Sequence, residues 1–286
     1  MVYLSSQAKL VLAIERAHDV TLVAYLLPRG PTFAALAAAA RRGARVVVRL
    51  EGRPYYDARG GIRRLNRSVA DDLAANGVDA RLVDGDGSAP VHAKAALVDG
   101  RLYLDDVNFA RGGEGTIVRD DARPDARALR DAIEGRSDPP RDGFALRKND
   151  ALALEAGLLG AAGGHAPVAV ESESIGSGNA VYSALERLGA AGCAPRLLVS
   201  REALSAKERS LLGRLRAGGV SVRVCSSNEK FALAGSRAWV GSANATSAYL
   251  TPRQLDWGVR TPNPAIVDEL RAHFEARWQS ARALSA

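Results

Sequence analysis

Cysteine, long apolar runs and lysine are scarce in this chain of 286 residues, and the first two scarcities exclude whole classes of protein. Two cysteines cannot form a disulfide framework, and so low a number fits a reducing compartment. The longest unbroken apolar run, Phe33–Ala40, is far shorter than the about 20 residues that a membrane-spanning helix needs. Lys9, Glu15 and Arg16 interrupt the N-terminal stretch, so no signal peptide is expected. We therefore predict a cytoplasmic protein without stable membrane insertion.

The remaining composition is that of an ordinary globular protein, with 47% hydrophobic and 25% charged residues. The net charge of +7 is compatible with a polyanionic partner but does not establish one. Of the 39 basic residues only five are lysine. In so arginine-rich a chain a lysine can mark a position that needs a compact ammonium group. Two of the five, Lys94 and Lys230, occupy equivalent places, as described below.

Helical and strand patterns alternate along the first half of the chain. Its short runs rich in Val and Leu are typical of buried strands, and the helical stretches between them imply βαβ crossovers. Asp99-Gly100 is a strong hairpin signal. The expected helices are 7–18, 32–42, 62–76 and 125–133. The expected strands are 20–27, 45–50, 78–83, 92–98, 101–104 and 116–119.

The second half repeats this order after a Pro-rich, highly charged segment, 135–149, which we interpret as a linker. The expected helices are 152–162, 180–188, 206–217 and 264–277. The expected strands are 168–170, 196–200, 220–225, 230–234, 238–240 and 256–260. The sequence therefore predicts two similar α/β domains, 1–145 and 146–286.

Equal spacing of polar residues across the two hairpins indicates a duplication around one shared site. In both halves a His or Asn precedes a lysine by two residues, and an asparagine follows that lysine after 14 residues. Residues two apart on a strand face the same side, so the first pair can converge on one anion. The two sets are His92, Lys94 and Asn108 in the first half and Asn228, Lys230 and Asn244 in the second.

The run His92-x-Lys94-x-x-x-x-Asp99 resembles the HKD motif of the phospholipase D superfamily. Gly241-Ser242-Ala243-Asn244 resembles the GSxN element of the same superfamily, and residues 8–135 resemble its small Nuc-like bacterial phosphodiesterases in element order. The resemblance implies two α/β repeats packed about a pseudo-two-fold axis where the motifs meet, so that a monomer suffices for a complete site. It also implies a phosphohistidine intermediate, with no metal and no cofactor.

Carried over residue by residue, the resemblance assigns roles around a phosphodiester, which could belong to DNA or RNA. His92 becomes the nucleophile, and Glu114 becomes the carboxylate that orients it. The remaining positions become ligands of the phosphate oxygens: Lys94, Asn108, Lys230, Ser242, Asn244 and Asn228. Phosphoryl transfer needs such an activated nucleophile surrounded by positive charge and hydrogen-bond donors.

The second motif departs from the family pattern. Asn228 stands where the second histidine would be, and an amide cannot act as the general acid, a role worth about 10²–10⁴-fold in rate. Gly235 replaces the second aspartate, Asp256 stands at the second-half position of the family's glutamate, and Asp105-Asp106 replaces the first-half Gly-Ser. The candidates for a substitute acid are Asp106, Glu171 and Glu173.

Three functions remain open at this point. The chain could hydrolyse or transfer a phosphodiester through His92, as a nuclease for instance. It could instead be a catalytically inactive protein of the same fold that binds phosphate or nucleic acid. Hydrolysis of phospholipid headgroups is less favoured because no membrane-seeking stretch is evident.

Other features have simpler interpretations. Asp105, Asp106, His92 and Glu114 could form a metal cluster, but we favour carboxylates paired with lysines. His18, His165 and His273 lack any repeat support and are expected at the surface or at helix ends. The segment 53–67 contains five Arg and two Tyr and is either a polyanion-binding surface or a solvated helix face.

Overall fold

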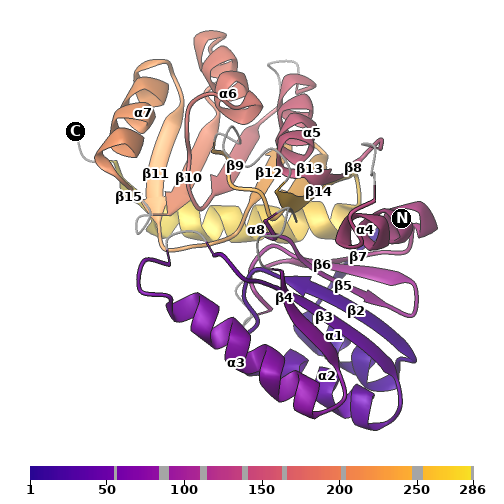
Figure 1. Cartoon of the computed structure of the whole chain (residues 1–286). Coiled ribbons are helices and arrows are strands. Elements are labelled where there is room, and N and C mark those ends of the chain that lie inside the picture. Colours follow the sequence, from indigo (N-terminus) through magenta and orange to yellow (C-terminus); the bar gives the residue numbers. More distant parts are fainter. Residues whose placement is uncertain are drawn as a thin grey trace. The chain divides into compact units, whose positions relative to one another are not determined.

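The computed structural model describes residues 1–54, 57–83, 90–109, 115–136, 141–162, 166–200, 204–246 and 254–284. The chain forms two compact units (Figure 1). The first comprises Met1–Pro139 together with Arg253–Trp257, and the second comprises Pro140–Pro252 and Gly258–Ala286. The sequence predicted a boundary after residue 145 and two continuous halves. The structure differs because a short segment from late in the chain belongs to the first unit.

The first unit is a seven-stranded mixed sheet with the strand order β4-β3-β2-β5-β6-β7-β1. Its strands are β1 (Val2–Ser5), β2 (Asp19–Ala24), β3 (Arg45–Glu51), β4 (Asp79–Val83), β5 (Lys94–Val98), β6 (Arg101–Asp105) and β7 (Ile117–Asp120). Its helices are α1 (Gln7–Arg16), α2 (Pro31–Arg41), α3 (Gly61–Ala75) and α4 (Arg123–Ile133). Strands β2, β3 and β4 are parallel, as the crossovers predicted, whereas β5, β6, β7 and β1 pair antiparallel.

The second unit is an eight-stranded sheet that repeats this order as β11-β10-β9-β12-β13-β14-β8, with β15 added beside β11. Its strands are β8 (Phe144–Arg147), β9 (Val168–Ser172), β10 (Arg196–Ser200), β11 (Ser221–Cys225), β12 (Phe231–Ala234), β13 (Arg237–Gly241), β14 (Leu255–Thr261) and β15 (Arg282–Ala283). Its helices are α5 (Lys148–Gly160), α6 (Ala180–Ala190), α7 (Ala206–Ala217) and α8 (Pro264–Ser280). The matching strand orders establish the predicted internal repeat.

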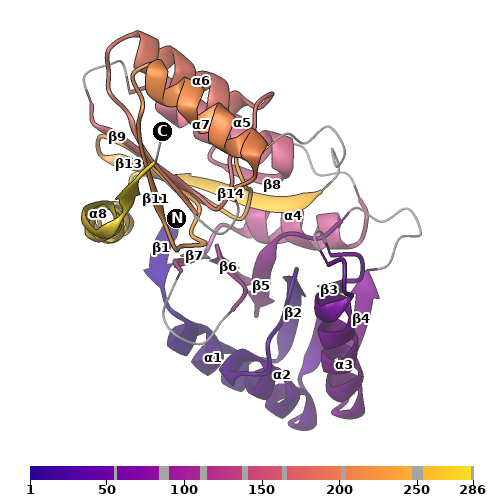
Figure 2. The same cartoon turned by 90° about the vertical axis from the view of Figure 1, so that its left-hand side faces the viewer.

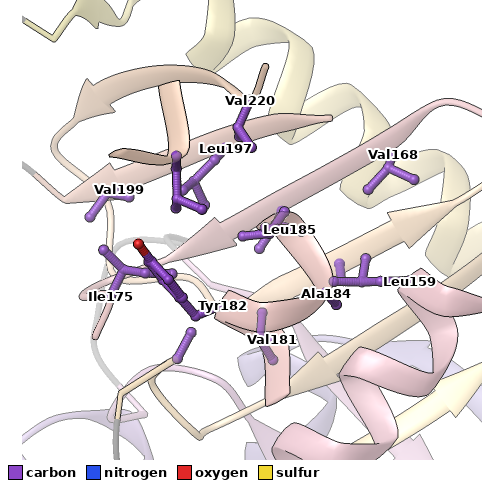
Figure 3. Packing of buried hydrophobic residues seen from close by; sticks show 14 of the residues in the cluster. Leu159, Val168, Ile175, Val181, Tyr182, Ala184, Leu185, Leu197, Val199 and Val220 are labelled. Atoms are coloured by element: carbon purple, nitrogen blue, oxygen red, sulfur yellow. The ribbon is translucent and has the colours of Figure 1, made fainter. Parts of the chain in front are cut away.

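Each unit has its own apolar core on one face of its sheet. In the first unit α1, α2 and α3 lie along the sheet (Figure 2). Leu10, Leu36 and Leu73 of these helices belong to one buried core together with residues of the strands. In the second unit residues of α5, α6 and α7 form such a core, and Figure 3 shows Tyr182 and Leu185 of α6 among the strand residues. Helix α8 contacts β11, β12 and β13 and carries Phe274, which meets Phe231 edge to face.

Three strands were not predicted, and all are short edge strands. β1 pairs only with β7, β15 pairs only with β11, and β8 is the outermost neighbour of β14. The interpretation of residues 135–149 as a linker is therefore wrong for its last part, because β8 and the start of α5 lie there. β8 is the counterpart of β1, so the second repeat begins earlier than its hydrophobic pattern indicates.

The hairpin between β5 and β6 turns at Asp99 and Gly100, which both have positive φ (46° and 81°). One Asp99 carboxylate oxygen accepts the backbone N–H of His18 (3.0 Å) and of Asp19 (2.9 Å), which ties the hairpin to the start of β2. The third residue of the HKD-like motif is therefore structural, as expected. Among the helices that the structure describes, none is long and apolar enough to cross a membrane.

Candidate active site

The strand β5 and the segment before it place His92 and Lys94 in the first unit. The backbone N–H groups of His92 (2.8 Å) and Ala93 (2.7 Å) both donate to the carbonyl oxygen of Leu255. Leu255 also forms a parallel bridge with Val91. The segment 254–257 is therefore fixed beside the HKD-like motif although it lies far away in the sequence.

This backbone pairing brings Asp256 to the imidazole of His92. One Asp256 carboxylate oxygen lies 2.8 Å from Nδ1 of His92, and the carboxylate is fully buried. The Gln254 side-chain amide donates to the other Asp256 oxygen at 2.6 Å. A buried carboxylate at Nδ1 holds the proton on that nitrogen and leaves Nε2 with its lone pair. Asp256 thus takes the orienting position for which the sequence nominated Glu114, and Glu114 lies outside the described residues.

Lys94 lies close to both nitrogens of the His92 ring. Its side chain is buried, and its Nζ donates to the backbone oxygen of His92 at 2.7 Å. The same Nζ lies 3.3 Å from Nε2 and 3.5 Å from Nδ1. The Tyr25 ring meets the imidazole edge on, with 5.2 Å between the ring centroids, and Lys94 Nζ lies 5.7 Å from the Tyr25 centroid. An ammonium group next to Nε2 is suited to hold an anion that this nitrogen would attack.

The two aspartates that replace Gly-Ser support the loop after β6. The carboxylate of Asp105 accepts the backbone N–H groups of Val107 and Phe109, and Phe109 has a positive φ of 50°. The carboxylate of Asp106 is fully buried and accepts the N–H of Thr116 at 2.8 Å. Both aspartates therefore have loop-stabilising hydrogen bonds. No potential metal-binding group of three or more His, Cys, Asp or Glu residues occurs in the part of the chain that the structure describes.

The corresponding residues of the second unit converge on a carboxylate. Lys230 is buried, and its Nζ donates to the backbone oxygen of Asn228 at 2.6 Å. The same Nζ lies 3.2 Å from Oε2 of Glu173, and the Asn244 side-chain amide donates to that Oε2 at 3.1 Å. Ser242 is fully buried nearby in sequence, and the Asn228 residue is exposed. Glu173 thus contacts two of the groups that the resemblance assigns to phosphate oxygens, Lys230 and Asn244.

Glu171 belongs to a different, buried charge cluster that faces α8. Arg277 of α8 donates to Glu171 at 3.0 Å and also to Glu229. His273, also on α8, lies 3.2 Å from the Glu229 carboxylate, so this histidine has a buried partner that the sequence did not predict. Burial raises the pKa of Glu171, and the positive charge of Arg277 offsets this in part. The position of Glu171 beside α8 supports a structural role for it.

The arginine-rich segment 53–67 runs from the end of β3 into α3. The side chains of Arg63, Arg64 and Arg67 lie on the exposed face of α3, and Arg53 is exposed in the preceding loop. Tyr55 and Tyr56, the proposed stacking residues, lie outside the described residues, as does His165. The polyanion-binding interpretation of this segment stays a prediction.

Comparison with known proteins finds a family model that matches much of the second unit. Residues 167–278 match the family model described as cardiolipin synthase, PLD-like domain. This model match confirms the predicted resemblance to the phospholipase D superfamily. A comparison with curated protein sequences finds no match.

Solved structures of the same fold cover almost the whole chain. Phosphatidylserine synthase from Haemophilus influenzae Rd KW20 matches with a TM-score of 0.66 and 8% identity, over 99% of this chain and 87% of that one. Polyphosphate kinase from Porphyromonas gingivalis matches with a TM-score of 0.68 and 16% identity, over 97% of this chain but only 47% of that one. Nuc from Salmonella typhimurium aligns with 49% of this chain and 94% of its own, at 16% identity and a TM-score of 0.42.

Proposed function

We propose that this protein is a phosphodiesterase that forms a phosphohistidine on His92. The observation that carries the proposal is the buried Asp256 carboxylate, 2.8 Å from Nδ1 of His92, with Lys94 beside Nε2. A ring whose Nδ1–H is held by a carboxylate presents Nε2 as a nucleophile, and the adjacent ammonium stabilises the phosphate oxygens during attack.

The reaction would take place in two steps. Nε2 of His92 attacks phosphorus, and the P–O bond to the leaving group breaks. Water then attacks the phosphohistidine, and the P–N bond breaks, which returns His92 to its starting state. Family resemblance supports Lys94, Asn108, Lys230, Ser242 and Asn244 as phosphate ligands. The substrate class is a phosphodiester, and a nucleic acid would be one source of it.

The first test is turnover of bis(p-nitrophenyl) phosphate by the wild-type protein and by His92→Ala. We expect turnover in the wild type and none in the variant. Acid-free trapping of the phosphorylated protein, followed by peptide mapping, should place the adduct on His92. Absence of turnover and of adduct, across several diesters, would overturn the proposal.

A second candidate function is binding without catalysis. It is favoured by one observation: Asn228, at the position of the second histidine, carries an amide that cannot donate a proton as a general acid. Binding of DNA that weakens steeply with salt, without any cleavage, would support this alternative. Such binding should fall when exposed arginines of the segment 53–67 are replaced.

A further inference from the structure

The backbone around His92 is fixed by hydrogen bonds at three consecutive N–H groups. Those of His92 and Ala93 donate to the carbonyl oxygen of Leu255, as described above. The N–H of Val91, the residue before them, donates instead to a side chain, because Oε2 of Glu51 accepts it at 2.5 Å. Glu51 is the last residue of β3, so another strand of the first unit holds the backbone that leads to the imidazole.

The Glu51 carboxylate is buried and accepts from a second backbone group. The residue is 2% exposed, and Oε1 accepts the N–H of Arg53 at 2.5 Å. A buried carboxylate is costly unless hydrogen bonds replace its lost water. Both oxygens of an ionised carboxylate can accept, and hydrogen bonds to a charged acceptor are stronger than those between neutral groups. Glu51 is therefore a firmer support for Val91 than a neutral side chain would be.

Asn66 of α3 extends this support to the aromatic neighbour of the imidazole. It is fully buried, and its side-chain amide donates to the backbone oxygens of Glu51 (2.9 Å) and Tyr25 (2.8 Å). The ring of Tyr25 in turn meets the His92 ring edge on. Buried polar side chains thus join three segments of the first unit: the residue after β2, the end of β3 and the segment before β5.

The second repeat builds the same strand order without this carboxylate. In each unit the strand opposite the lysine also pairs with the strand that ends at this position, and these registers make Ser200 the counterpart of Glu51. Asn228 is the counterpart of His92. The fold therefore does not require a carboxylate here, and the carboxylate occurs in the copy that has the imidazole. This correspondence supports a role of Glu51 that is connected with His92.

We propose that Glu51 is a positioning residue of the phosphodiesterase, which holds the residue before His92 so that the imidazole stays against Asp256. This inference rests on the proposed function. Because Glu51 fixes Val91 and Leu255 fixes His92, the backbone that carries the ring has little freedom to turn. Catalysis is sensitive to such placement, since a displacement of about 1 Å can cost about 10²-fold in rate.

The test is the turnover of bis(p-nitrophenyl) phosphate by Glu51→Gln. The new side chain has nearly the same size, but it accepts on one atom only, and its amide group faces a backbone donor. Because the hydrogen bonds of Glu51 described above support backbone, kcat should fall by about 10–10²-fold with little change in KM. An unchanged kcat, or a loss confined to KM, would overturn the proposal.

Asp120→Asn is the matched control. Asp120 is 1% exposed and accepts the N–H of Ala122 at 2.9 Å, so it too is a buried carboxylate that supports backbone. The β5–β6 and β6–β7 registers place it at the hairpin end of the sheet, opposite the end that carries His92. Both variants should unfold at a lower temperature, but only Glu51→Gln should lose kcat. Equal losses of kcat would show that Glu51 is merely structural and would overturn the proposal.

Glu51→Asp keeps the charge but shortens the side chain. It should retain more of kcat than Glu51→Gln, because a charge-assisted hydrogen bond to Val91 can form again in part. A loss as large as that of Glu51→Gln would contradict the proposal. If Glu51→Gln is too unstable to assay, Glu51→Asp is compared with Asp120→Asn instead. A loss of kcat only in Glu51→Asp is then expected, and equal values would overturn the proposal.

A spectroscopic measurement separates the failure of this inference from the failure of the proposed function. The proton that Nδ1 of His92 donates to Asp256 should give a protected, downfield NMR resonance that is absent from His92→Ala. This resonance should broaden or disappear in Glu51→Gln and remain in Asp120→Asn, and no turnover is needed to observe it. Such a response in a protein without turnover would support the Glu51 role and refute the phosphodiesterase. A resonance that is unchanged in Glu51→Gln would refute the Glu51 role.

Discussion

At the scale of single residues, the proposed function depends on which nitrogen of the His92 imidazole carries its proton. The Asp256 carboxylate faces Nδ1 of His92, and Gln254 holds the other carboxylate oxygen. The same arrangement occurs in catalytic triads, in which a buried carboxylate fixes the tautomer of a histidine without taking its proton. Asp256 is therefore a positioning residue.

The variant Asp256→Asn should keep the site's shape and lose most of its turnover. An amide can donate to Nδ1, which would shift the ring proton to Nε2 and block attack on phosphorus. We expect the turnover of bis(p-nitrophenyl) phosphate to fall by up to about 10⁴-fold with little change in KM. Asp142→Asn removes a 96% exposed carboxylate and serves as the control. A fall of less than twofold in Asp256→Asn would contradict the positioning role.

Some residues of this site could be predicted from the sequence, and others could not. His92 and Lys94 were predicted because their spacing repeats in the second half. Asp256 was recognised as a family position, but its partner was not, because 164 residues separate it from His92. Backbone pairing at Leu255 brings them together, and no local pattern encodes such pairing.

At the scale of secondary-structure elements, helix α6 ends in close contact with the turn that precedes β11. A methyl group added to Gly189 would lie 2.3 Å from the carbonyl oxygen of Gly218. Gly218 and Gly219 begin this turn, so the neighbouring backbone leaves no room for a side chain.

Gly189→Ala should therefore destabilise the protein by about 1–3 kcal/mol, as overpacking does. Gly213→Ala is the matched control, because its added methyl group would meet nothing within 4 Å and Gly213 lies inside α7. That control should gain about 0.5–1 kcal/mol, since alanine favours a helix interior. Urea unfolding curves measure both changes, and equal midpoints for the two variants would refute the close approach.

Most helices and strands were predictable from the sequence. The strands that were missed show which signal such a prediction needs. Long runs with helical or strand periodicity gave the central strands and all eight described helices within a few residues. The edge strands β1, β8 and β15 were missed because a short strand with one partner carries little hydrophobic pattern. The antiparallel pairing of β5, β6 and β7 follows from the hairpin, whereas the position of β1 beside β7 does not.

At the scale of the whole molecule, the stability of the second unit should depend on pH through its buried charges. Burial alone would raise the pKa of Glu229, but hydrogen bonds from His273 and Arg277 outweigh it and lower this pKa to about 2. The hydrogen bond to Glu229 is also the main reason why the pKa of His273 is raised above its usual value. At pH values between the pKa of Glu229 and the pKa of His273, both groups are charged, and their ion pair stabilises the fold.

A raised histidine pKa gives stability that is complete below the unfolded value, about 6.5, and lost as pH rises through the folded value. His273→Gln should therefore lower Tm clearly at pH 5–6 and much less at pH 9, as measured by thermal unfolding. His18 is exposed, and no ion pair of His18 occurs among the residues that the structure describes, so His18→Gln should have little effect at either pH. A His273→Gln effect that is constant or larger at pH 9 would show that the pair is not the cause.

The segment Arg253–Trp257 joins the first unit although it is encoded after most of the second. A gene truncated at Pro139 would yield a polypeptide that retains the proposed nucleophile His92 but not the Asp256 carboxylate and the Gln254 amide that orient it. Only complementation with the C-terminal fragment could restore the correct tautomer. Under the proposed function, the copy with the degenerate motif is thus indispensable to the intact one, which gives selection a reason to retain the whole duplicated gene.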